Sequence, residues 1–159
     1  MKKFILILLV ISAAFSSCSK TDNTPTFDAA AQAVADDATI KAYLAAHTSI
    51  TATKDPSGVY YQIITQGTGA NATSTSTISA NYNGSLLDGT VFDKTTTNSL
   101  SFSLSQVIKG WQIGIPLVKA GGRILLIIPS GLAYGNSSPS SLIPVNSVLL
   151  FTIDVLTVK

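Results

Sequence analysis

Apolar and polar residues alternate along much of the second half of the chain. Residues 100–104 read Leu-Ser-Phe-Ser-Leu, and residues 148–158 place Phe151, Ile153 and Val155 on one face. A period of two is typical of strands that have one face in a core. Further β-prone runs between turn-forming segments cover residues 59–64, 78–86 and 91–93. The pattern therefore predicts a protein built mainly from strands.

Two apolar patterns break this alternation. Residues 123–128 form a near-continuous apolar run, which predicts a central strand covered on both faces. Residues 110–117 have apolar positions at roughly helical spacing and predict one short helix. With about five strands and no alternation of strands with helices, the chain predicts an α+β fold, an antiparallel sheet wrapped around one short helix.

A second helix is predicted ahead of the sheet, over residues 28–47. This segment is rich in alanine and lacks glycine and proline. At helical spacing, one face would gather its larger apolar side chains, Val34, Ile40, Tyr43 and Leu44. The sequence does not decide whether this helix packs on the domain, pairs with a second copy or holds the domain away from a membrane.

The ends of this helix carry suitable residues. Thr26 or Asp28 could cap its start. His47, the sole histidine, lies near its C-terminal end, where a partly positive ring suits the helix dipole. Because a metal site would need further His or Cys ligands, we expect no metal there.

Composition limits the kinds of partner. Hydrophobic residues make up 46% of the 159 residues, charged residues make up 11%, and glutamate is absent. Eight Asp stand against ten Lys plus Arg, and setting aside Lys2 and Lys3 leaves eight against eight. A neutral body argues against nucleic acid as a partner, since binding to phosphates depends on positive charge.

The N-terminus has the features of a secretory signal. Lys2 and Lys3 precede an apolar run over residues 4–11 that is too short to span a bilayer, and small residues then lead to Cys18. Cys18 is the sole cysteine, so no intrachain disulfide can form. A cysteine after small residues resembles the lipobox of bacterial lipoproteins, which implies a lipid anchor on Cys18; the alternative is an ordinary secreted protein with a free thiol. Ser19 resembles the residue found in lipoproteins sorted to the outer membrane, which implies an outer-membrane location in the cell envelope. We expect the domain to face the periplasm, but the sequence leaves open which leaflet carries the anchor.

These observations divide the chain into four parts. Residues 1–17 are the predicted signal peptide, 18–27 a flexible tether, 28–54 a helical segment and 55–159 the folded domain. The tether is assigned because it is polar, contains one proline and shows no periodicity.

Short motifs follow one another through the domain. They are Ala80-Asn81-Tyr82-Asn83-Gly84, Gly89-Thr90-Val91-Phe92-Asp93, Phe102-Ser103-Leu104 with Val107-Ile108-Lys109-Gly110-Trp111, Gly121-Gly122-Arg123, Ile128-Pro129, Leu132-Ala133-Tyr134-Gly135 and Ile143-Pro144. Each motif alone is weak evidence. In this order they resemble the FK506-binding-protein (FKBP) family of peptidyl-prolyl cis-trans isomerases, and the resemblance covers about residues 57–159.

The resemblance implies an apolar pocket for a proline ring. Trp111, the sole tryptophan, would form the floor of the pocket, and Phe102 would be a core residue of the site. The walls would come from Tyr82, Phe92, Val107, Ile108 and Phe151. Leu100 stands where many members of the family have a second aromatic residue, so we expect that wall to be less stacked.

The resemblance also implies which polar groups meet the substrate. These would be the backbone N–H of Ile108 and the hydroxyl of Tyr134. Asp93 would hydrogen-bond beside Tyr82 at the rim of the pocket, and Ile143 would lie in a loop that overhangs it.

Rotation about an Xaa-Pro bond breaks no covalent bond, so the implied activity needs no nucleophile, metal or cofactor. The implied partners are proline-containing segments of unfolded or exported proteins, with FK506- or rapamycin-like macrolides as ligands. Two alternatives stay open: a chaperone-like lipoprotein that binds proline segments with little turnover, and a lipoprotein whose domain is a spacer. The clustered aromatic residues disfavour the spacer.

Overall fold

The computed structural model describes residues 27–159. The predicted signal peptide, the lipid anchor at Cys18 and all of the tether except Phe27 lie outside the described residues. Within residues 27–159, no helix is both long enough and apolar enough to cross a membrane.

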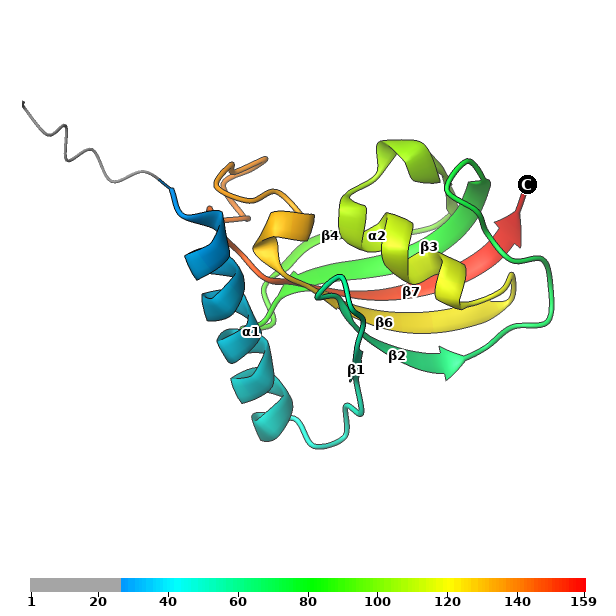
Figure 1. Cartoon of the computed structure of the whole chain (residues 1–159). Coiled ribbons are helices and arrows are strands. Elements are labelled where there is room, and N and C mark those ends of the chain that lie inside the picture. The colour runs from blue at the N-terminus through cyan, green and yellow to red at the C-terminus, as the bar shows by residue number, and fades with distance from the viewer. Residues whose placement is uncertain (1–26) are drawn as a thin grey trace, which may run out of the picture.

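A seven-stranded antiparallel sheet forms the body of the described chain (Figure 1). Its strands are β1 (Thr53–Lys54), β2 (Tyr60–Thr65), β3 (Thr77–Leu86), β4 (Val91–Lys94), β5 (Leu100–Ser103), β6 (Gly122–Ile128) and β7 (Leu149–Val158). Their order is β1-β2-β6-β7-β3-β4, and β5 also pairs with β3. The long strands β3 and β7 pair from Ile78 with Val158 to Leu86 with Leu149. The α+β prediction is confirmed, with β6 in the interior of the sheet.

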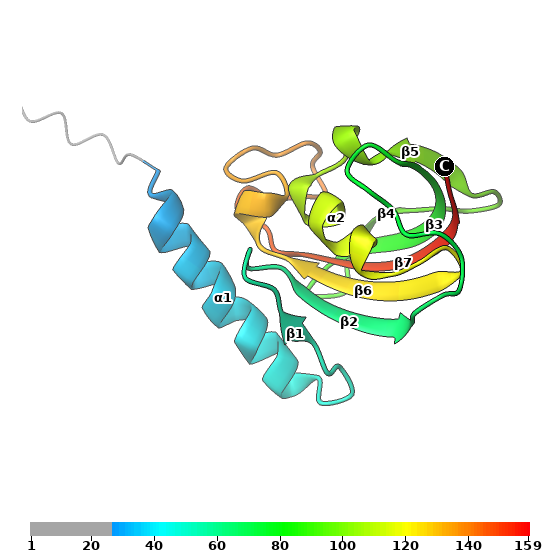
Figure 2. The same cartoon turned by 45° about the vertical axis from the view of Figure 1, so that its right-hand side comes forward.

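The helices are α1 (Ala29–Ala46) and α2 (Lys109–Gly114), with three 3-10 turns, η1 (Leu104–Gln106), η2 (Ile115–Leu117) and η3 (Ser130–Leu132). Figures 1 and 2 show α2 lying over the sheet, with α1 outside it next to β1 and to the orange turn η3. Both helices fall where the apolar pattern predicts them.

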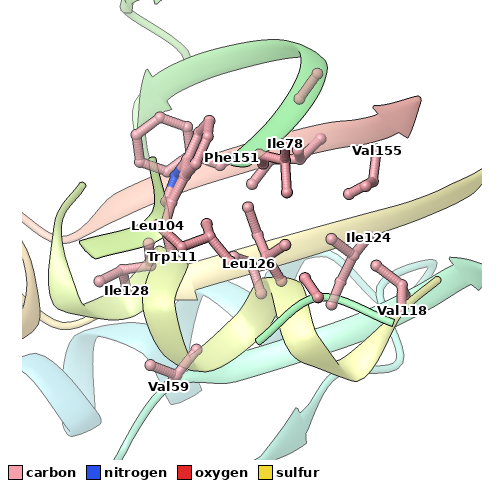
Figure 3. Close-up of a cluster of buried hydrophobic side chains, with 14 of the residues drawn as sticks. Val59, Ile78, Leu104, Trp111, Val118, Ile124, Leu126, Ile128, Phe151 and Val155 are labelled. Carbon is pink, nitrogen blue, oxygen red and sulfur yellow. The ribbon is translucent and has the colours of Figure 1, made fainter. Parts of the chain in front are cut away.

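Alternate residues of β6 point to opposite faces of the sheet and enter two different cores. Ile124, Leu126 and Ile128 lie in the main core under α2, together with Trp111, Ile115 and Phe151 (Figure 3). Leu125 and Ile127 lie in a smaller core with Ile40, Tyr60 and Val148, which α1 covers. Because both faces of β6 are covered, its run of apolar residues is explained.

Two glycines let α2 approach the sheet. A Cβ atom added to Gly110 would lie 2.4 Å from Ile128 Cγ2, and one added to Gly114 would lie 2.4 Å from Leu126 Cδ2. These residues are four positions apart and therefore share the inner face of the helix. Their missing side chains bring the backbone of α2 close to β6 and place Trp111 deep in the main core.

The first helix packs on the domain, which answers a question that the sequence leaves open. Asp28 caps its start by accepting hydrogen bonds from the N–H groups of Ala30 (2.9 Å) and Ala31 (3.0 Å). At the other end, the His47 ring stacks on Tyr43, and its Nδ1 lies 2.8 Å from the Tyr43 carbonyl oxygen. Both end residues therefore have local structural contacts.

The predicted inner face of this helix is partly wrong. Val34 is 72% exposed, whereas Asp36 and Ile40 are buried. Residues 36 and 40 lie one above the other on a helix, and residue 34 points elsewhere. The helix turns its one buried carboxylate inward because Ser130 of the sheet domain supplies the hydrogen bonds for it.

Strand β1 lies where a turn is expected from the composition of residues 54–58. The turn itself is present, since Gly58 N–H donates to the Asp55 carbonyl and Asp55 N–H to the Val59 carbonyl, both at 2.8 Å. It folds Lys54 back beside Tyr60, which extends the sheet by a two-residue strand.

Candidate functional site

A cavity of about 290 Å³ opens at the edge of the main core. Its lining comes from seven parts of the chain: β3, β4, β5, the segment from η1 to α2, α2 itself, the loop after η3, and β7. The lining residues are Tyr82, Phe92, Asp93, Phe102, Gln106, Val107, Ile108, Trp111, Tyr134 and Phe151. The fold thus gathers residues that are far apart in the sequence around one small space.

Trp111 is the centre of the aromatic wall. Its ring is 4% exposed and lies edge to face with Tyr82, Phe102 and Phe151, at centroid distances of 5.3, 5.4 and 5.4 Å. Such T-shaped contacts are the geometry that aromatic quadrupoles favour. Figure 3 shows the indole beside Phe151, above the side chains of β6. The cavity therefore has a rigid, largely apolar floor.

A glycine in β3 leaves room for a second aromatic pair. A Cβ on Gly84 would lie 2.7 Å from a ring carbon of Phe151 and 2.8 Å from two ring carbons of Phe92. These two rings also meet edge to face, at 5.5 Å. Gly84 belongs to the motif around Tyr82, and its close contact with both rings explains why a small residue is needed there.

The hydroxyl of Tyr82 is engaged by a carboxylate at the rim. It donates to Asp93 Oδ2 at 2.5 Å, from β3 to the neighbouring strand β4. Burial raises the pKa of Tyr82 far above its usual value, and the hydrogen bond and charge of Asp93 raise it further. Tyr82 therefore stays protonated near neutral pH, with its proton directed at Asp93 and away from any ligand.

Tyr134 differs from Tyr82 in having a free hydroxyl. It is 39% exposed, and no residue in the described part of the chain hydrogen-bonds its hydroxyl oxygen. Partial burial raises the pKa of Tyr134, and the nearby Asp93 charge adds to this rise. A protonated phenol that lines the cavity and has no protein acceptor is available as a donor to a ligand.

A backbone donor lies at the start of α2. Between residues 27 and 159, no acceptor takes the N–H of Ile108, although its carbonyl accepts from Trp111 N–H at 3.0 Å. The preceding residue is held in place because Gln112 Nε2 donates to the Val107 carbonyl at 2.8 Å. Two unpaired donors from different segments, Ile108 N–H and Tyr134 O–H, thus lie beside the cavity, and the buried indole Nε1–H of Trp111 also has no acceptor among residues 27–159.

One residue expected at the site lies elsewhere, and one lining residue was not expected. Ile143 is 5% exposed and packs in the main core, and it is not part of the cavity lining. Ser138 Oγ donates to its carbonyl at 2.7 Å, which folds the loop inward at this point. Gln106 lines the cavity instead. Gln106 lies in the sequence between the Phe102 motif and Trp111, which is a signal that it is near the site. The sequence gives no reason to predict a single polar residue in a turn as part of the cavity lining.

A larger cavity, of about 600 Å³, lies between α1 and the loop after η3. Its lining includes Phe27, Asp36, Lys54 and Leu132, and Phe27 is its single aromatic residue. It lacks the convergent aromatic rings of the smaller cavity, so we take the smaller cavity as the candidate site although its volume is smaller. Residues 27–159 contain no group of three His, Cys, Asp or Glu side chains that could hold a metal ion.

Comparison with known proteins gives the family of the chain. Residues 69–156 match the family model of FKBP-type peptidyl-prolyl cis-trans isomerases, which is more than half of the chain. A probable FKBP-type peptidyl-prolyl cis-trans isomerase of Haemophilus influenzae is 42% identical over 105 residues, which are 65% of this chain and 44% of that protein. The outer membrane protein MIP of Legionella longbeachae is 42% identical over 106 residues, covering 65% and 46% of the two chains.

A solved structure agrees as well. The crystal structure of FkpA from Escherichia coli matches with a TM-score of 0.70 and 36% identity, over 82% of this chain and 62% of that one. The chain thus spans less than half the length of the two curated relatives named above. On the family match and these relatives, the chain belongs to the FKBP-type peptidyl-prolyl cis-trans isomerase family.

Proposed function

We propose that this protein is a peptidyl-prolyl cis-trans isomerase that assists the folding of exported proteins. The observation that carries the proposal is the combination of an edge-to-face aromatic cavity centred on Trp111 with two unpaired donors at its rim. The cavity volume of about 290 Å³ is at the lower end of small-molecule sites, which suits a proline ring and its neighbouring amide.

The chemistry requires no covalent step. The barrier to rotation about an amide is roughly 18–20 kcal/mol, because the planar form is stabilised by resonance. A twisted amide has a less polar carbonyl, so an apolar wall accommodates it better than it accommodates either planar form. In this proposal the rings around Trp111 hold the pyrrolidine and face the twisting amide. Each tenfold gain in rate needs about 1.4 kcal/mol of preference for the twisted state.

The polar groups would orient the chain on either side of the proline. Ile108 N–H and Tyr134 O–H donate to substrate carbonyls from fixed positions, so they need little reorganisation as the amide turns. Asp93 acts through Tyr82: by accepting the Tyr82 proton, it fixes the ring that forms one wall of the cavity. Each of these residues then has a separate role in binding, donation or positioning.

The test is the isomerisation rate of a short Xaa-Pro peptide in the presence of the purified chain. We expect acceleration at micromolar protein. Tyr134→Phe removes one donor while keeping the ring, and should lower kcat/KM about fivefold, since a hydrogen bond contributes on the order of 1 kcal/mol.

The matched control is Tyr43→Phe, which removes a hydroxyl on α1 away from the cavity and should leave the rate unchanged. If the wild-type chain binds proline peptides without accelerating their isomerisation, the function is that of a binding module with little turnover. If Tyr134→Phe matches the wild type, the role of Tyr134 as donor is wrong.

The proposal includes the cellular setting. Lipid attachment at Cys18 would tether the domain to the outer membrane, facing the periplasm, where its clients would be proline-containing segments of exported proteins. Similarity to a protein named outer membrane protein MIP supports a cell-envelope location. Incorporation of labelled fatty acid at Cys18 in growing cells is the measurement that decides whether the chain has a lipid anchor.

The same aromatic cavity would accept FK506- or rapamycin-like macrolides, because these present a comparable apolar ring.

A further inference from the structure

A buried carboxylate connects the first helix to the loop that carries Tyr134. Asp36, on the inner face of α1, is 3% exposed. Its Oδ2 accepts from Ser130 N–H at 2.8 Å and from Ser130 Oγ at 2.7 Å, and its Oδ1 accepts from Gln32 Nε2 at 2.7 Å. A carboxylate this deeply buried is rare unless its oxygens are paired, and here both of them are.

The receiving residue begins the turn η3. The residue before the turn is Pro129, whose side chain has no acceptor to cap it, so the first N–H of the turn needs an acceptor from outside. Asp36 of α1 is that acceptor, although it lies 94 positions away in the sequence. Figure 1 shows the orange turn η3 beside the first helix.

Ser130 in turn holds the backbone on both sides of Tyr134. Its carbonyl accepts from Ala133 N–H at 2.9 Å and from Gly135 N–H at 2.8 Å. Ser130 itself is fully buried. A single residue therefore separates the carboxylate of Asp36 from the two peptide groups that set the position of Tyr134.

We propose that Asp36 is a positioning residue for Tyr134, so that α1 is a working part of the substrate site and not merely an added cover on the sheet. This inference rests on the proposed function, in which the Tyr134 hydroxyl donates to substrate. Asp36 does not line the aromatic cavity, so it acts through Ser130 and the loop. Loss of the carboxylate leaves Ser130 N–H and Oγ without their acceptor, and the residue that accepts from Ala133 and Gly135 is then held less firmly.

The experiment compares Asp36→Ala with Asp28→Ala in the full chain. Asp28 also accepts two backbone hydrogen bonds, but both come from the exposed start of α1 and neither from η3. Both substitutions weaken the helix, so loss of stability alone does not distinguish them. We expect Asp36→Ala to lower kcat for the Xaa-Pro peptide about tenfold, because a small misplacement of a donor reduces the rate strongly. KM should change less than about twofold, since the rings that hold the proline are untouched, and Asp28→Ala should keep the wild-type kcat and KM.

A second readout follows the loop directly. The N–H groups of Ala133 and Gly135 are bonded to the Ser130 carbonyl, so their hydrogen exchange reports whether the loop is held. In Asp36→Ala we expect both to exchange roughly tenfold faster than in Asp28→Ala. Asp36→Asn keeps the shape and one acceptor oxygen, so it should restore most of both values. If Asp36→Ala fails to fold, Ser130→Ala takes its place: it removes only the hydrogen bond from Ser130 Oγ to Asp36 Oδ2, and it should lower kcat and speed the exchange in the same direction by a smaller factor.

The outcomes separate this inference from the proposed function. A wild-type chain without isomerase activity refutes the function, and with it the catalytic role of Asp36. An active wild type with unchanged kcat in Asp36→Ala overturns the inference alone, as does an unchanged exchange rate at residues 133 and 135. If kcat falls equally in Asp36→Ala and Asp28→Ala, Asp36 only stabilises α1, and the inference that it positions Tyr134 is likewise overturned.

Discussion

Under α2, Trp111 meets three aromatic rings edge to face, and burial of apolar surface dominates that core. Under α1, the apolar core is small, and charged side chains join the helix to the rest of the chain. Asp37 contacts Lys41 Nζ at 2.7 Å, Lys54 Nζ at 2.5 Å and the Tyr60 hydroxyl at 2.7 Å. Asp36, the preceding residue, accepts a hydrogen bond from Ser130. The two sides of one sheet are therefore held by different kinds of interaction.

The difference has a consequence for each helix. Apolar packing is not directional, so the α2 side is defined by the volume and shape of its rings, which together enclose the cavity. Hydrogen bonds and ion pairs are directional, so the α1 side fixes how the helix is rotated and where it lies along the sheet. An alanine-rich helix with few large apolar residues needs such contacts to have one position. The α2 side thus supplies a binding surface, and the α1 side supplies alignment.

The largest effect should come from breaking the aromatic centre. Trp111→Ala removes the floor of the cavity and should lower the free energy of unfolding by about 3–5 kcal/mol and abolish isomerisation. Ile127→Ala is the matched change on the α1 side, because Ile127 is fully buried in the smaller core. It should cost about 2–5 kcal/mol of stability while the folded fraction keeps its activity.

Urea unfolding followed by circular dichroism gives both stabilities, and the peptide assay at low temperature gives both activities. Circular dichroism is needed because Trp111 is the sole tryptophan, so its replacement removes the indole fluorescence. Equal loss of activity in the two variants would mean that the two sides are not functionally distinct.

A smaller effect should follow from pushing α2 away from the sheet. Gly110→Ala introduces a Cβ atom 2.4 Å from Ile128 Cγ2, so the helix or β6 has to shift, at a cost of about 1–3 kcal/mol. Because α2 carries Trp111 and follows Ile108, the shift should also reduce kcat/KM. Gly131→Ala is the control, since nothing lies within 4 Å of a Cβ at that position. Unfolding midpoints that are equal for the two variants would show that α2 is not closely packed.

Much of the α2 side could be predicted from the sequence, for a physical reason. Strand β7 has one face in the core, so buried apolar residues alternate along most of its length. The cavity residues lie in short motifs whose residue types are constrained by contact, as with Gly84 between Phe92 and Phe151. Local pattern and tertiary role agree at these positions.

The α1 side was harder because its decisive contacts are long range and polar. Val34 is apolar yet exposed, and Asp36 is charged yet buried. At position 36, the hydrogen bonds that the carboxylate accepts from Ser130 matter more than the burial of an apolar side chain. The apolar periodicity of residues 28–47 does not indicate that a distant residue, Ser130, supplies hydrogen-bond donors to this helix. The buried position of Ile143 is similar: it depends on how Ser138 folds its loop, which the apolar pattern does not encode.

The smallest expected effect is the change of folding stability with pH. The tyrosines on the α1 side and on the α2 side contribute to this change separately. Burial, with the hydrogen bond and charge of Asp37, raises the pKa of Tyr60 to about 12 from a usual value of 10.0. Because the folded chain holds this proton more tightly than the unfolded chain, the resulting stability is complete below pH 10 and is lost as the pH rises from 10 to about 12. Tyr82 and Tyr134 also have raised pKa values, so wild-type stability should fall over this range with contributions from both sides.

Tyr60→Phe isolates the contribution of the α1 side. This variant lacks the titrating hydroxyl at Asp37 but keeps the ring in the smaller core, so its stability should fall less steeply with pH above 10 than that of the wild type. Urea midpoints measured at intervals from pH 8 to 12 give the two slopes, and Tyr82→Phe gives the matching slope for the α2 side. The isomerisation rate at neutral pH should stay at its wild-type value in Tyr60→Phe, because Tyr60 does not line the cavity. Parallel slopes for Tyr60→Phe and the wild type would show that the contact between Asp37 and Tyr60 does not stabilise the docked helix, which would leave the hydrogen bonds of Asp36 to Ser130 and the ion pair of Asp37 with Lys54 to align α1.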